Sequence, residues 1–158
     1  MTMILGGIED CELRESLVGS VDYRKLRGLR FAELRKPLGL DWTEAEGKAD
    51  QLDRHFGLYL NGELVGTVVI SALKSGLSKL RQIAVAHSHQ GRGLGRILMA
   101  GIESLLAMEG AKGFELHARL EVAGFYDALD YVREGDLFEE IGLPHVKMVK
   151  LLKESGSV

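Results

Sequence analysis

Three glycines alternate with basic and apolar residues between a β-branched run and a long amphipathic segment. Gly91, Gly93 and Gly95 are spaced two apart, and Arg92 and Arg96 lie among them. A helix that begins here would present backbone N–H groups without internal partners, and its dipole would add partial positive charge. Glycines let that backbone approach a diphosphate without an intervening Cβ atom. The residue types therefore predict a pyrophosphate-binding loop.

Two common phosphate-binding motifs do not fit this loop. A P-loop requires Gly-Lys followed by Ser or Thr, whereas Gly95 is followed by Arg96 and Ile97. The dinucleotide pattern G-x-G-x-x-G requires glycine at position 96 or 98, where this chain has Arg96 and Leu98. A nucleotide-binding regulator, which would bind ATP or NAD, is therefore disfavoured.

The loop does match Q-x-x-G-x-G through Gln90, Gly93 and Gly95, shortly after an apolar run at residues 83–85. With this motif between a strand and a long amphipathic helix, the chain resembles the GNAT superfamily of N-acyltransferases, in which the motif binds coenzyme A. Residues 125–131 are similar to the family's F-Y-x-x-L-G-F segment, although Asp130 replaces the usual glycine. The resemblance implies an acyl-coenzyme A-dependent N-acetyltransferase.

Further segments extend the resemblance over most of the chain, from about residue 26 to residue 149. Residues 34–39 (L-R-K-P-L-G) and 142–145 (G-L-P-H) are similar to segments of small, single-domain, bacterial-type GNAT proteins. No internal repeat or Pro-, Gly- or Ser-rich linker interrupts the chain, so we expect one domain over residues 1–158.

Hydrophobic periodicity predicts the elements that position the loop. Expected helices cover residues 21–36, 43–54, 94–109 and 122–129, and expected strands cover residues 56–60, 64–72, 77–85, 114–117 and a final hairpin over residues 131–152 broken at 142–144. Thr43 and Glu46 form a capping box, and Asn61-Gly62 indicates a tight hairpin. The order predicts an α+β fold with a central parallel pair.

The resemblance adds a more detailed arrangement. It implies a mixed, mostly antiparallel sheet of about six to seven strands with flanking helices, splayed between strand four (77–85) and strand five (114–117). Backbone groups of Ile83, Ala84 and Val85 would bind the pantetheine arm like a missing strand, and the N–H of Val85 would polarise the thioester carbonyl. The pyrophosphate would be held by Gln90, Gly91, Arg92, Gly93, Leu94, Gly95 and Arg96.

Proton transfer requires further side chains. Tyr126, which matches the tyrosine of the F-Y segment, would contact the cofactor and protonate the departing thiolate; without the family it would be interpreted as a core aromatic. The identity of the general base is left open, because the strand at 77–85 contains no carboxylate. His117 and His145 are candidates for a relay through water, but His145 could instead cap a turn and His117 could pack or face solvent.

Composition limits the partners. The net charge of −3 argues against a broad nucleic-acid surface, and no apolar run approaches the length of a membrane span. A single cysteine among 158 residues suits a reducing compartment, so a cytoplasmic protein is expected. His87 and His89 lack a third ligand at suitable spacing, so no metal is expected.

The expected partner is a small-molecule or peptide amine acceptor, whose identity cannot be read from the sequence. The resemblance is compatible with a homodimer but leaves the oligomeric state open. A non-catalytic module that binds or senses acyl-coenzyme A is the alternative function, since it would need the glycine loop but no acid.

Overall fold

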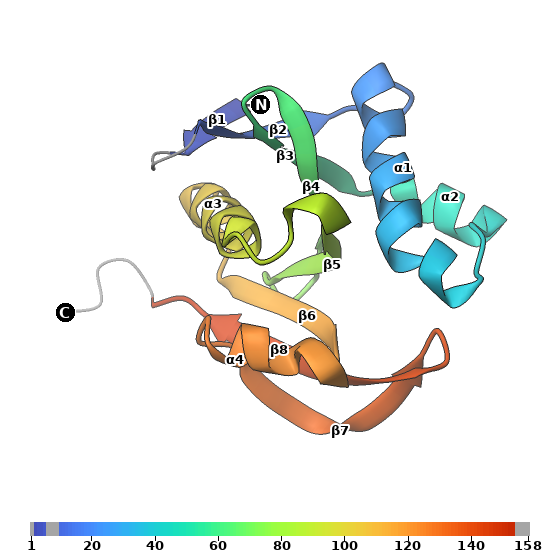
Figure 1. Cartoon of the computed structure of the whole chain (residues 1–158). Helices are drawn as coiled ribbons and strands as arrows, with labels where there is room; N and C mark the ends of the chain where they lie inside the picture. The colour runs from blue at the N-terminus through green and yellow to red at the C-terminus, as the bar shows by residue number, and fades with distance from the viewer. Residues whose placement is uncertain (1, 6–9, 154–158) are drawn as a thin grey trace.

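Eight strands form one sheet in the computed structural model, which describes residues 2–5 and 10–153 (Figure 1). The strand order is β1-β2-β3-β4-β5-β6-β8-β7, and every pair is antiparallel except β5 with β6. The strands are β1 (Thr2–Leu5), β2 (Cys11–Ser16), β3 (Arg54–Leu60), β4 (Glu63–Ala72), β5 (Ser78–Val85), β6 (Gly113–Arg119), β7 (Val132–Glu140) and β8 (Leu143–Leu151). The predicted parallel central pair is confirmed.

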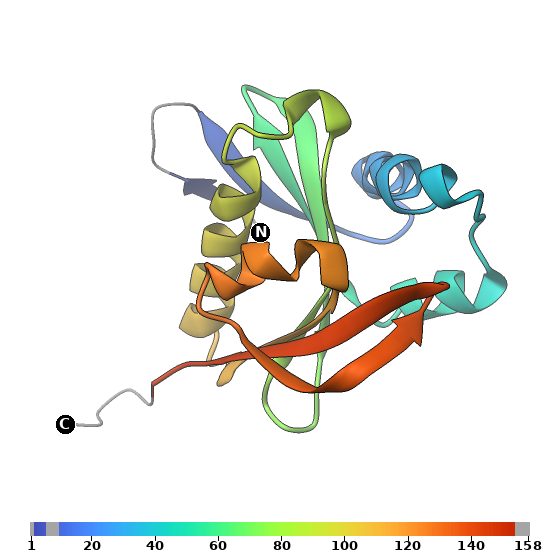
Figure 2. The same cartoon turned by 60° about the horizontal axis from the view of Figure 1, so that its bottom comes forward.

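Helices cover both faces of this sheet. Helices α3 and α4 lie on one face and helices α1 and α2 on the other (Figures 1 and 2). The helices are α1 (Val21–Leu34), α2 (Glu44–Asp50), α3 (Leu94–Met108) and α4 (Ala123–Asp127), with short 3-10 turns η1 (Lys36–Leu38), η2 (His87–His89) and η3 (Leu120–Val122). The fold class predicted from the sequence is thereby confirmed.

The main core lies between α3 and the sheet. The apolar stripe predicted for this helix is buried, with Leu98 and Ile102 fully inaccessible. It packs in one hydrophobic cluster with strand residues such as Val68, Phe114 and Leu116. Burying such side chains is the dominant favourable term in folding, so this contact fixes the position at which α3 begins.

The sequence-based prediction missed β1 and β2, and its estimate of six to seven strands was therefore low. In β2, buried Cys11 and Leu13 alternate with the charged residues Glu12 and Arg14, which pair with each other at the surface. Such a short alternation resembles an irregular polar segment unless its partner strands are known. The strands predicted as four and five are β5 and β6.

The turns agree closely with expectation. Asn61 and Gly62 both have positive φ, 50° and 84°, as a tight hairpin turn requires. The C-terminal hairpin turns at Ile141 and Gly142, with φ of 49° and 76°, so its break lies slightly before the predicted 142–144. The Thr43 hydroxyl accepts from the Glu46 N–H as predicted, but α2 ends at Asp50 because the chain then turns into β3.

A β-bulge lies in β5 just after the point where this strand stops pairing with β6. On β4, Val68 lies opposite two residues of β5, Gln82 and Ile83, and Gln82 has a φ of 51°. The parallel ladder joins only Ser78–Leu80 to residues 114–116 and stops just before the bulge. A bulge bends its strand and disrupts pairing, so the two strands diverge beyond this point. The predicted splay is confirmed.

A buried polar network centred on Arg30 of α1 holds the bulge in position. Arg30, which is 1% exposed, donates from Nε to Gln82 Oε1 at 2.6 Å and pairs with both carboxylate oxygens of Asp50 at 3.1 and 3.2 Å. The Tyr23 hydroxyl donates to the same carboxylate. Burial alone would raise the pKa of Asp50, but the hydrogen bonds from Arg30 and Tyr23 lower it. The network therefore ties α1 and α2 to the irregular part of β5.

Candidate active site

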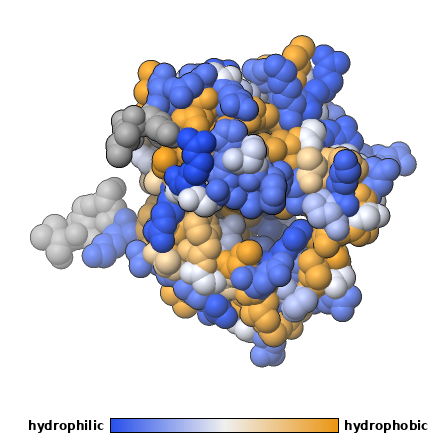
Figure 3. Space-filling view, viewed as in Figure 1, coloured by the Kyte–Doolittle hydropathy of each residue, from blue (hydrophilic) through white to orange (hydrophobic). Residues whose placement is uncertain are grey.

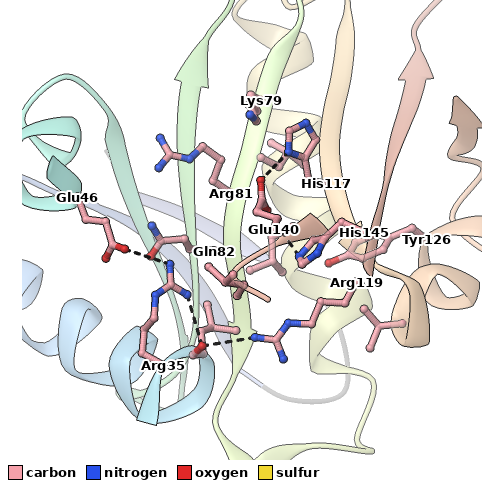
Figure 4. Close-up of a pocket in the computed structure, with 16 residues that line it drawn as sticks. Arg35, Glu46, Lys79, Arg81, Gln82, His117, Arg119, Tyr126, Glu140 and His145 are labelled. Atoms are coloured by element: carbon pink, nitrogen blue, oxygen red, sulfur yellow. Dashed lines mark hydrogen bonds and ion pairs between the residues drawn. The ribbon is translucent and has the colours of Figure 1, made fainter. Parts of the chain in front are cut away.

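A cleft of about 390 Å³ lies where β5 and β6 diverge. Its walls come from both strands, the end of α1, helix α2, Tyr126 of α4 and the β7–β8 hairpin. Figure 3 shows the surface hollowed near the centre of the view, between the part that contains α1 and α3 and the part built from β6 to β8. Figure 4 shows that most of the labelled side chains around the cleft are charged or polar.

The glycine loop opens α3 as predicted. Gly91 and Gly93 have φ of 77° and 80°, and no protein atom lies within 4 Å of a Cβ built on either. Both glycines and Arg92 are exposed, so the backbone that precedes α3 is accessible. The Gln90 side chain donates to the Val85 carbonyl at 3.1 Å and thereby ties the loop to the end of β5.

Packing also explains the residue types at Leu94 and Gly95, apart from any contact with a ligand. Leu94 is buried, so only its backbone could meet a ligand. A Cβ on Gly95 would lie 3.3 Å from the Phe125 ring, so this glycine allows α4 to pack on the first turn of α3. Arg96 is exposed on that same turn.

The end of β5 directs backbone groups into the gap. The Ala86 N–H donates to the Val65 carbonyl of β4 at 2.8 Å. Because backbone groups of successive strand residues point to opposite edges, the N–H and C=O of Val85 face the gap toward β6. The Gln90 bond to the Val85 carbonyl agrees with this direction. By the same alternation Ile83 also faces the gap, whereas Ala84 faces β4, so the predicted backbone contact of Ala84 with pantetheine does not fit this direction.

Tyr126 reaches the cleft from the face of the sheet that α3 and α4 cover. It belongs to α4, is 8% exposed and lines the cleft wall. Its ring makes edge contacts with Phe125 and Tyr131 at centroid distances of 5.0 and 5.9 Å. Burial raises the pKa of Tyr126 to about 12, so its hydroxyl keeps its proton throughout the neutral range. Asp130, at the usual glycine position, takes a left-handed φ of 71° after this helix.

The two candidate histidines lie together, joined by a carboxylate that the sequence did not reveal. His117 Nδ1 is 3.0 Å from Oε1 of Glu140, and His145 Nε2 is 3.6 Å from Oε2 of the same residue. Nδ1 of His145 donates to the Leu143 carbonyl at 2.8 Å. All three side chains line the cleft (Figure 4). Glu140 ends β7, and only the pairing of β7 with β8 and of β8 with β6 brings its side chain within reach of His117.

Comparison with known proteins agrees with this architecture. The family model described as an acetyltransferase (GNAT) domain matches residues 41–152. The Bacillus subtilis protein YyaT is 32% identical over 97 residues, which are 61% of this chain and 65% of YyaT. The chain thus spans just under two thirds of the length of that relative.

Solved structures share the fold. Escherichia coli ElaA superposes with a TM-score of 0.75 at 21% identity, over 89% of this chain and 99% of that one. A GNAT family acetyltransferase from Elizabethkingia anophelis, solved with acetyl-CoA bound, superposes with a TM-score of 0.68 at 14% identity, over 90% of this chain and 98% of that one. The chain belongs to the GNAT acetyltransferase family, as its motif predicted.

Two features of the described residues bear on the other expectations. No helix there is long and apolar enough to cross a membrane, and no three His, Cys, Asp or Glu side chains in that part of the chain group as a metal site would require. His89 lies 3.8 Å from Glu63 and beside Ser88. Cytoplasmic location, the absence of a metal and a homodimer all stay predictions.

Proposed function

We propose that this protein transfers an acetyl group from acetyl-CoA to a primary amine. The observation that supports this most directly is the splayed β5–β6 gap, which has a buried tyrosine on its wall and the exposed glycine loop tied to the end of β5. Pantetheine would bond the backbone of Ile83 and Val85, and the diphosphate would meet the N–H groups that open α3, with Arg92 and Arg96 beside them. Related GNAT structures hold acetyl-CoA and CoA.

In the proposed reaction, the neutral amine attacks the thioester carbonyl carbon, and a C–N bond forms as the C–S bond breaks. The Val85 N–H would stabilise the oxyanion. The departing thiolate would take a proton from Tyr126, while the attacking nitrogen loses a proton to a base, and transfer of that proton from the base to the tyrosinate, through water, would restore both groups. Atoms and charge then balance as an amide and free CoA thiol.

His117 is the better candidate for that base. When its Nδ1–H donates to Glu140, its Nε2 holds the lone pair that can accept a proton. The edge contact with Phe138, at 4.9 Å between ring centroids, further restrains the imidazole. His145 is 3% exposed and already donates to a backbone carbonyl, which favours a positioning role for it.

Acetyl-CoA should stabilise the folded protein. A ligand that binds only the native state adds about 2.7 kcal/mol at a hundredfold excess over Kd, so the melting temperature should rise with ligand concentration. Differential scanning fluorimetry and calorimetry measure this rise and the Kd. Absence of binding at millimolar acetyl-CoA would contradict the proposal. If acetyl-CoA binds but no amine causes release of CoA thiol, the result would instead favour a sensing module.

Gly93→Val should weaken CoA binding much more than it weakens the fold. A branched residue at a φ of 80° is strained, and its side chain would occupy the space before the first turn of α3. Gly110→Val is a matched control, because Gly110 also has a positive φ, 98°, and open surroundings, but lies at the other end of α3. Calorimetry should show a raised Kd for Gly93→Val alone; equal Kd values for the two variants would remove the loop from the binding site.

A further inference from the structure

Two arginines from different elements converge on one backbone oxygen at the edge of the cleft. Arg35, just after α1, donates from Nη1 to the Leu34 carbonyl at 3.4 Å, and Arg119, at the end of β6, donates from Nη2 to the same oxygen at 3.4 Å. Both guanidinium groups line the cleft (Figure 4). Two positive charges thus share one neutral acceptor at long hydrogen-bond distances.

The surrounding carboxylates balance only part of this charge. Glu46 Oε1 lies 3.7 Å from Arg35. No carboxylate in the part of the chain that the structure describes lies within ion-pair distance of Arg119. Asp53 is engaged with Arg81 at 2.8 Å. The pair therefore has one excess positive charge in a partly enclosed space, where charges interact more strongly than in open water.

We propose that Arg35 and Arg119 bind a carboxylate of the acceptor, so that the substrate is a small amino acid-type molecule with both an amine and a carboxylate. This inference rests on the proposed acetyl transfer. A carboxylate can accept short, charge-assisted bonds from two guanidinium groups in place of the long bonds to Leu34. A cleft of about 390 Å³ suits a small molecule. The amine would then face His117 and Glu140 on another wall of the cleft.

The test is acetylation of matched pairs, each an acid and its decarboxylated amine: phenylalanine with phenethylamine, leucine with isopentylamine, and 4-aminobutyrate with propylamine. The readout is kcat/KM from CoA thiol release. In at least one pair the acid should exceed the amine by about tenfold or more, the scale of one charge-assisted contact. Amines that react as well as their acids in every pair would overturn the inference.

Variants separate recognition from the intrinsic reactivity of each amine. Arg119→Gln and Arg35→Gln should each reduce the acid-to-amine ratio toward one, mainly through KM for the acid, and leave kcat/KM for the amine nearly unchanged. Arg24→Gln removes the same charge from an exposed position on α1 and should keep the wild-type ratio. An unchanged ratio in both cleft variants would refute the assignment.

Two further experiments test whether the recognised anion is a phosphate and not a carboxylate, and what the arginines bind if no amine is acetylated. If O-phosphoethanolamine is preferred over ethanolamine while no acid is preferred over its amine, the carboxylate assignment is wrong. If no amine releases thiol, the proposed acetyl transfer fails, and calorimetry on the CoA complex still tests the arginines. N-acetylphenylalanine should then bind more tightly than N-phenethylacetamide, and equal binding would overturn the anion site.

Discussion

Tyr126→Phe should lower turnover by about 100-fold or more and leave the affinity for acetyl-CoA unchanged. The substitution removes one hydroxyl and preserves the aromatic volume that packs against Phe125 and Tyr131. If the hydroxyl assists departure of the thiolate, its loss acts only in the transition state. Steady-state kinetics with a reactive amine and calorimetry with acetyl-CoA measure the two quantities separately.

The pH dependence sharpens this prediction. A tyrosine at its reference pKa near 10 would add a high-pH limb to the rate profile. Burial raises the pKa of Tyr126 to about 12, and a donor is active below its pKa, so the active form extends to more alkaline pH. The deficit of the variant should therefore be the same at pH 7 and pH 9. Tyr59→Phe is the control, because Tyr59 is a buried tyrosine that does not line the cleft.

A turnover close to wild type in Tyr126→Phe would exclude the tyrosine as the acid. Protonation of the thiolate would then fall to water or to the pair formed by His117 and Glu140. His117→Gln should lower turnover in either case, because His117 is also the proposed base for the attacking amine.

Arg30→Met should destabilise the fold by about 3–5 kcal/mol, the usual effect of removing one partner from a buried ion pair. The change leaves the Asp50 carboxylate buried without its main partner and releases Gln82 at the bulge. Urea unfolding followed by circular dichroism measures the free energy of unfolding. Arg24→Met, at an exposed site on the same helix, should change it by no more than about 0.5 kcal/mol.

The double variant Arg30→Met with Asp50→Leu provides a second comparison. Replacing a buried pair by apolar residues is often neutral in stability, so the double variant should recover part of the loss. A single variant as stable as wild type would show that the network contributes little. A double variant less stable than the single one would show that Asp50 acts through Tyr23 instead.

The sequence predicted the regular elements well where apolar residues repeat with a clear period. The stripe that includes Leu98 and Ile102 identified α3, and the pair Asn61-Gly62 identified a turn that needs positive φ twice. The loop at Gly91 and Gly93 was recognisable because few functions need alternating glycines at a helix start. These signals are local, so one sequence contains them completely.

Features that depend on distant residues were not predicted. Glu140 meets His117 only because β7 pairs with β8 and β8 pairs with β6, a register that no local pattern specifies. Arg35 and Arg119 are separated by about half of the chain, and their convergence follows from how α1 crosses the sheet. The bulge at Gln82 was also missed, since its left-handed φ falls on a residue other than glycine.

The short ladder between β5 and β6 has a mechanical consequence. Within the sheet, the part from β1 to β5 and the part from β6 to β8 are joined by three residue pairs, although α3 also contributes core contacts to both. In the proposed complex, a cofactor that bonds to the edge of β5 would act as a brace between these two parts. The rigidity that aligns the reacting groups would then come partly from the cofactor itself. A substitution that loosens β6 against β5 would raise the cofactor Kd and lower turnover together, even at a distance from both reactants.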